Sequence, residues 1–156
     1  MRETTGFSIR KYRVLPEDLE RISVLSVIGL CSWKILERLY MPLKMETDIS
    51  GDVVILYCAG RLVFGDETAA FRERIKNILL GAKQIVVNLS GIEYIDSGGL
   101  GTLVGMLAST RNRHGEIKLV SPNQRVADLL RRTRLNTVFK SYKSDDEAVR
   151  AFRTNS

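Results

Sequence analysis

Histidine and cysteine, on which many catalytic sites and most zinc sites depend, are nearly absent from this sequence. Its 156 residues include one histidine, His114, and two cysteines, Cys31 and Cys58, whose spacing fits neither a disulfide framework nor a zinc site. Cys58 lies in an apolar run and is expected to be a core residue in a protein of the reducing cytoplasm. The sequence therefore predicts no metal site and no cofactor.

No hydrophobic run is long enough to cross a membrane. Residues 22–33 are largely apolar, but they fall short of the roughly 20 residues of a transmembrane helix, and Ser23, Ser26 and Gly29 interrupt them. Acidic residues before this run and the lack of a small-residue cleavage site after it argue against a signal peptide. Residues 1–40 are therefore expected to be an extension, partly helical or added by a misassigned start before Met41, and residues 41–156 a single domain.

The motifs of common enzyme classes are also missing. There is no P-loop, and the run Gly99-Leu100-Gly101 fails as a dinucleotide fingerprint because Val104 takes the place of the third glycine. A Gly-x-Ser-x-Gly hydrolase would need glycine where Ile95 precedes Ser97. His114 lies about a helix length from Ser97 at ~1.5 Å per residue, too far to act as its general base. We therefore expect a binding protein and not an enzyme.

The charge is moderately basic, at a formal +6 from 24 Lys and Arg against 18 Asp and Glu. Such an excess favours an acidic protein partner, or simply keeps the chain in solution. The one dense basic cluster, Arg131-Arg132-Thr133-Arg134, contains no aromatic residue. Because nucleic-acid surfaces usually combine basic and aromatic side chains, direct binding to DNA or RNA is not expected.

Apolar periodicity predicts an α/β domain from residue 43 onward, in which strands alternate with helices. The predicted strands cover residues 43–49, 53–58, 84–89, 116–120 and 137–142. The predicted helices cover residues 68–80, from about 97 to 113, 124–134 and a last one after residue 144. The first two strands should form a hairpin, Gly81 should end the first helix, and Ser144 with Glu147 should form a capping box.

The stretch Asp96-Ser97-Gly98-Gly99 lies where the central predicted strand becomes a helix. An apolar stripe follows at helical spacing, formed by Leu100, Leu103, Val104, Leu107 and Ala108. Ser97 is expected to be the N-cap, with its hydroxyl left uncovered by the two glycines. One interpretation is a purely structural cap. The other is a phosphorylation site, where backbone N–H groups favour the phosphate and Asp96 opposes its charge.

The run Asp96-Ser97-Gly98-Gly99-Leu100-Gly101, preceded by residues 88–95, resembles the signature of the STAS family, the bacterial anti-sigma-factor antagonists. Members commonly read "Asp-Leu-Ser-Gly-Val, two residues, Ile-Asp-Ser-Ser-Gly-Leu-Gly". The resemblance covers roughly residues 43–153, with Gly98 in place of the usual second serine. It implies a mixed sheet of about four to five strands with helices mostly on one face.

The resemblance also implies a function. The unmodified domain would bind an anti-sigma factor that is also a serine kinase, and so free a sigma factor. Phosphorylation of Ser97 would end the complex, and a serine phosphatase would restore it. In this view Asp96 sets the local charge, the glycines allow close approach and Leu100 anchors the helix. The residues expected to bind the partner are Asp96, Gly98, Gly99, Leu100, Thr102 and Phe64.

Two alternatives remain open. The chain departs from sporulation-type members, which tend to read Gly-Glu-Leu-Asp where residues 60–66 read Gly-Arg-Leu-Val-Phe-Gly-Asp. It could therefore be a STAS interaction module of a stress-signalling or lipid-transport complex without a sigma factor. It could also bind a nucleotide or another anion at the helix N-terminus beside Gly98 and Gly99.

Overall fold

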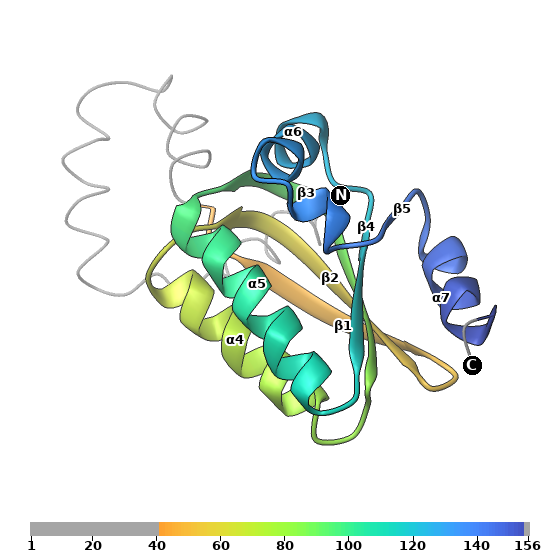
Figure 1. Cartoon of the computed structure of the whole chain (residues 1–156). Helices are drawn as coiled ribbons and strands as arrows, with labels where there is room; N and C mark the ends of the chain where they lie inside the picture. Colours follow the sequence, from red (N-terminus) through yellow and green to blue (C-terminus); the bar gives the residue numbers. More distant parts are fainter. Residues whose placement is uncertain (1–40, 155–156) are drawn as a thin grey trace, which may run out of the picture. The chain divides into compact units, whose positions relative to one another are not determined.

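A computed structural model describes residues 41–154. It contains a five-stranded mixed sheet in the order β1-β2-β3-β4-β5 (Figure 1). The strands are β1 (Lys44–Ser50), β2 (Val53–Leu62), β3 (Gln84–Ile95), β4 (Glu116–Val120) and β5 (Ser141–Tyr142). Only β1 and β2 are antiparallel and form the predicted hairpin, whereas the other pairs are parallel. The predicted extension, residues 1–40, and Cys31 lie outside the described residues.

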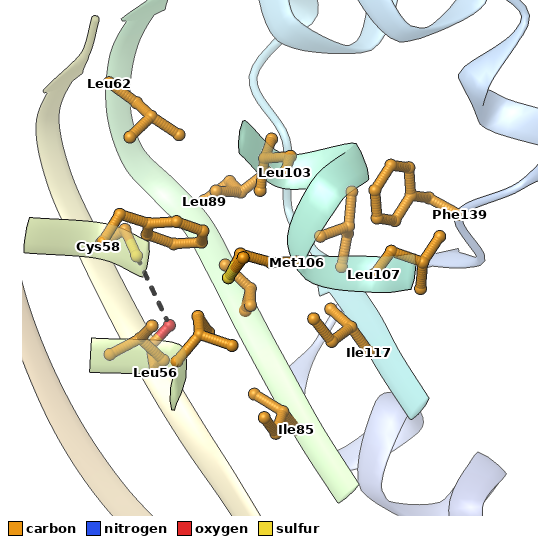
Figure 2. Close-up of a cluster of buried hydrophobic side chains, with 14 of the residues drawn as sticks. Leu56, Cys58, Leu62, Ile85, Leu89, Leu103, Met106, Leu107, Ile117 and Phe139 are labelled. Carbon is orange, nitrogen blue, oxygen red and sulfur yellow. Dashed lines mark hydrogen bonds between the residues drawn. The ribbon is translucent and has the colours of Figure 1, made fainter. Parts of the chain in front are cut away.

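The helices cover both faces of the sheet, with three on one face. Helices α4 (Asp66–Ile78), α5 (Ser97–Asn112) and α6 (Gln124–Arg132) lie on this face and bury their apolar stripes in the larger core (Figure 1). In this core, residues of α5 meet residues of β2 and β3 (Figure 2). Helix α7 (Asp145–Thr154) packs on the opposite face, where Ala148, Val149 and Phe152 contact alternate residues of the strands. The predicted fold class is confirmed.

The larger core accounts for Cys58. Its thiol is 3 % exposed and lies 3.9 Å from the carbonyl oxygen of Leu56 (Figure 2). Burial raises the pKa of the Cys58 thiol to about 12, because the interior disfavours the thiolate. Cys58 is therefore an inert core residue, as the sequence predicted.

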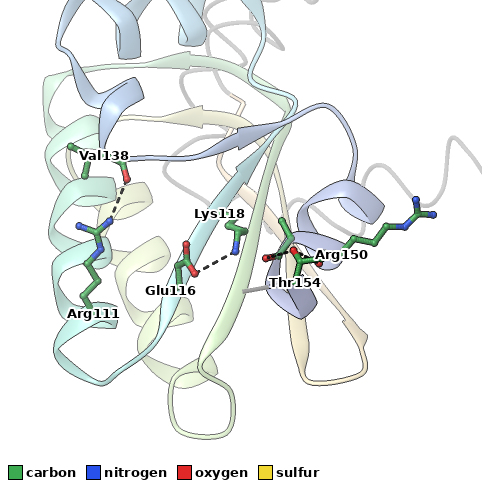
Figure 3. Close-up of polar contacts among 7 residues, drawn as sticks. Arg111, Glu116, Lys118, Val138, Arg150 and Thr154 are labelled. Carbon is green, nitrogen blue, oxygen red and sulfur yellow. Dashed lines mark hydrogen bonds and ion pairs between the residues drawn. The ribbon is translucent and has the colours of Figure 1, made fainter. Parts of the chain in front are cut away.

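The smaller core contains a buried cation. Lys118 of β4 is completely buried, and its amine lies 3.3 Å from Oε2 of Glu116 (Figure 3). The amine also lies 3.5 Å from the centroid of the Phe152 ring. Burial lowers the pKa of Lys118, and the Glu116 carboxylate partly offsets this. Strand β4 thus contacts α7 through a cation over an aromatic face.

Several predicted boundaries were wrong. Residues 137–142 do not form one strand: a 3₁₀ turn, η1 (Leu135–Thr137), comes first, and β5 is only two residues long. The reason is that Phe139 is buried in the larger core and interrupts the extended run. Gly81 is not the C-cap of α4, since Leu79 holds that position. Ser144 caps α7 as predicted, because it accepts from the N–H of Glu147 at 3.2 Å. The predicted capping box is incomplete, since the Glu147 carboxylate accepts from the N–H of Lys143 and not from that of Ser144.

Candidate functional site

Strand β3 is longer than predicted and runs directly into α5. It continues through Ile95, and only Asp96 separates it from Ser97, the first residue of the helix. The N-cap is Asp96, whose Oδ1 accepts from the N–H of Gly99 at 2.7 Å. The prediction that Ser97 is the cap was therefore wrong. Aspartate and serine are both good caps, and the backbone places Asp96 in the extended conformation that a cap requires. The Ser97 side chain is left exposed.

The carboxylate of Asp96 also binds the loop that follows β2. The N–H of Phe64 donates to both carboxylate oxygens, at 3.0 and 3.2 Å, and the N–H of Asp96 donates back to the carbonyl of Leu62 at 3.3 Å. Desolvation raises the pKa of Asp96, but backbone N–H groups and the charge of Arg61 outweigh it and leave the pKa below its usual value. Asp96 is therefore ionised at neutral pH and joins the loop to the helix.

The two glycines allow close approach within the chain itself. A Cβ at Gly98 would stand 2.6 Å from the Cβ of Phe64, and a Cβ at Gly99 would overlap the carbonyl oxygen of Leu62. The loop after β2 thus lies directly against the first turn of α5. Gly98, which replaces the usual serine of the signature, leaves room for Phe64.

Two aromatic side chains and one basic side chain lie close to Ser97 in the chain, or at the end of β2 and in the loop packed against α5. Phe64 is 81 % exposed, and Tyr94, near the end of β3, is 46 % exposed. The Arg61 guanidinium lies 5.2 Å from the centroid of the Tyr94 ring, consistent with their pairing across β2 and β3. Phe64 was predicted from the sequence as a partner contact, whereas no sequence pattern singled out Arg61 or Tyr94. They could have been found only by knowing that β2 extends to Leu62 and in which register it pairs.

The remaining predicted site residues divide between surface and core. Leu100 is half-buried and packs on the larger core, which agrees with a helix anchor. Thr102 is 6 % exposed and donates its hydroxyl to the carbonyl of Gly98 at 2.9 Å. The expectation that Thr102 lies near a partner is therefore not met, because its side chain faces inward. His114 is exposed just beyond the far end of α5, away from Ser97.

The requirements of a metal site and of a membrane span can be compared with the described residues. Within residues 41–154, no group of three or more His, Cys, Asp or Glu side chains is placed to hold a metal ion. No helix in this part of the chain is long and apolar enough to span a bilayer. The positive end of α5 is not an open anion site either, because the Asp96 carboxylate already accepts from its first turn.

Comparison with known proteins identifies relatives of this arrangement. A family model described as "STAS domain" matches residues 44–148. A Thermotoga neapolitana protein with the provisional name anti-sigma factor antagonist is 41% identical over 69 residues, which cover 44% of this chain and 61% of the relative. The match thus spans less than two thirds of that protein.

Two solved structures extend the comparison. A crystal structure of a Thermotoga maritima protein with the same provisional name is 32% identical, covers 76% of this chain and 98% of its own, and has a TM-score of 0.63. The Bacillus cell fate determinant SpoIIAA in its phosphorylated form is 17% identical over 70% of this chain and 98% of its own, with a TM-score of 0.56. At that identity the second likeness concerns the fold alone.

Proposed function

The chain belongs to the STAS domain family, and we propose that it is an anti-sigma factor antagonist whose partner binding is switched by phosphorylation of Ser97. The observation that carries the proposal is the position of this serine. Its hydroxyl is exposed at the start of α5, beside an ionised carboxylate and an exposed aromatic side chain. The name of the T. maritima relative supports the same function. We further propose that the protein acts in the cytoplasm as a binding protein and not as an enzyme.

In this proposal the unmodified surface binds an anti-sigma factor with serine kinase activity. Phe64 supplies an apolar contact beside the exposed Ser97. The kinase transfers the γ-phosphoryl group of ATP to the Ser97 oxygen, with loss of the hydroxyl proton and release of ADP. A serine phosphatase hydrolyses the ester and restores the binding form.

The electrostatics favour a switch that acts by repulsion. A phosphate at Ser97 carries up to two negative charges, and the nearest backbone donors already bind the Asp96 carboxylate. Because the pKa of Asp96 is lowered, the phosphate would lie beside an ionised carboxylate. Few hydrogen-bond donors would remain to neutralise the phosphate where it faces the partner. The same donors would be needed by a nucleotide or another anion, so this geometry favours the switch over an anion-binding domain.

The test compares Ser97→Ala and Ser97→Asp forms of the full chain as baits in native lysate, read by mass spectrometry. Ser141→Asp is a matched control, because Ser141 is exposed on β5 and gives the same charge change elsewhere. We expect the Ala form and the Ser141→Asp control to capture a kinase-type anti-sigma factor, and the Ser97→Asp form to lose it. Capture of one set by all three baits, or of transporter or scaffold subunits alone, would contradict the switch. It would favour a constitutive STAS module.

A further inference from the structure

The positive charge of this protein is concentrated in one segment. Residues 111–143 contain nine Lys and Arg against two Asp and Glu, whereas the whole chain has 24 against 18. The excess in this segment is therefore larger than the net charge of the chain. Apart from Lys118, each of these cations is exposed.

The fold brings several of these cations to one place. Helix α6 buries Val126 and Leu130, and so turns Arg131 and Arg132 outward in its last turn. Arg134 follows in the left-handed conformation, with φ 58°, and begins η1. Buried Phe139 fixes the chain after this turn.

Helix α5 contributes a further arginine. The Arg111 guanidinium, near the end of α5, donates to the carbonyl of Val138 at 3.4 Å, just after η1 (Figure 3). Arginines from α5, α6 and η1 thus lie around one turn of chain. We define the basic surface as Arg111, Arg131, Arg132 and Arg134.

The basic surface is barely neutralised by the protein itself. Asp128 pairs with Arg131 at 3.2 Å, but within residues 41–154 no carboxylate pairs with Arg111, Arg132 or Arg134. Clustered like charges repel one another and oppose folding, so this arrangement is not explained by stability. Negative charge on a bound molecule would reduce the repulsion among these arginines.

We propose that the basic surface binds an acidic segment of a protein partner, at a site separate from Ser97. A protein is favoured over nucleic acid because the exposed aromatic side chains of the described part, Phe64, Tyr94 and Tyr57, lie on other elements. It is favoured over a lipid surface because Val138, 37 % exposed, is the one large hydrophobic side chain exposed there.

Arg111 of the basic surface is remote from the switch residue. Ser97 is the first residue of α5 and Arg111 lies fourteen residues later, which separates them by about 21 Å along the helix axis. This exceeds the Debye length of about 8 Å at physiological salt, so charge at Ser97 should hardly affect Arg111. Because the proposed site is separate from Ser97, we expect its binding not to depend on the state of Ser97.

The test uses fluorescence anisotropy of a labelled glutamate-rich peptide with the full chain, at about 0.15 M salt. The variant Arg131→Gln/Arg132→Gln/Arg134→Gln removes three charges from the basic surface. The control Arg72→Gln/Arg74→Gln/Lys76→Gln removes three exposed charges from α4, so the net charge of the two proteins is the same. Circular dichroism verifies that both variants are folded.

We expect the first variant to bind roughly tenfold more weakly, since each exposed pair contributes about a factor of two, and the control to stay within about twofold. Ser97→Asp should bind as the unmodified chain does. Absence of peptide binding, or equal loss in both triple variants, would overturn the proposal. So would tighter binding to duplex DNA or phosphatidylserine vesicles that the first variant abolishes. Loss of binding in Ser97→Asp would refute a separate site.

Discussion

Replacing Gly99 by alanine tests whether direct backbone contact holds the start of α5 against the end of β2. The added Cβ would overlap the carbonyl oxygen of Leu62 and stand 2.9 Å from its carbonyl carbon. Neither group is the end of a flexible side chain, so the backbone itself must move. The shift would disturb the hydrogen bond between Asp96 and Leu62 and the two from Phe64 to Asp96.

The expected effect is a balance of opposing contributions. Overpacking costs about 1–3 kcal/mol, and a weakened hydrogen bond about 1 kcal/mol more. The higher helix propensity of alanine offsets up to about 1 kcal/mol of this loss of stability. We therefore expect Gly99→Ala to lower the free energy of unfolding by about 2 kcal/mol, or the Tm by roughly 8 °C.

The same helix provides the control. Gly101 and Gly105 have nothing within 4 Å of an added Cβ and are exposed. Alanine at either position should raise the free energy of unfolding by about 0.5–1 kcal/mol. Urea denaturation followed by far-UV circular dichroism measures all three variants. If Gly99→Ala were as stable as Gly101→Ala, the close approach of Leu62 to α5 would be refuted.

Two further predictions concern titratable groups. Asp96→Asn should cost about 1 kcal/mol at pH 7, because asparagine keeps only one of the two oxygens that accept from the N–H groups of Phe64 and Gly99. The pKa of Asp96 in the folded protein lies below its usual value of 3.8. The ionised carboxylate therefore stabilises the fold above pH 3.8, and this contribution is lost as the pH falls through the pKa of the folded protein. The difference in urea stability should therefore shrink at pH 3, and a constant difference would contradict the cap. Lys118→Met should leave stability at pH 7 unchanged or about 1 kcal/mol higher, since it removes a buried charge. Burial lowers the pKa of Lys118, so between this lowered pKa and 10.5 the unfolded chain binds more protons than the folded chain. As the pH rises toward 10.5, the free energy of unfolding of the parent protein should therefore increase relative to that of Lys118→Met. A loss above about 2 kcal/mol at pH 7 would show instead that the cation over Phe152 is stabilising.

The sequence alone determined the alternation of strands and helices, the hairpin and the junction at Asp96 and Ser97. These features depend on local periodicity and on turn and cap chemistry, which neighbouring residues encode. The signature around Ser97 also indicated the family before any fold was known. The buried faces followed from the same periodicity, as Cys58 and the apolar stripe of α7 show.

Tertiary structure decided what depends on residues distant in the chain. Asp96 caps α5 and binds the N–H of Phe64, 32 residues away, so local pattern could not separate its role from that of Ser97. Thr102 is buried because the first turn of α5 lies against β2, which only the packing of the two elements determines. The last strand is short because Phe139 enters the core. The stacking of Arg61 on Tyr94 likewise depends on the register of two parallel strands, and register is set by long-range pairing rather than by neighbouring residues.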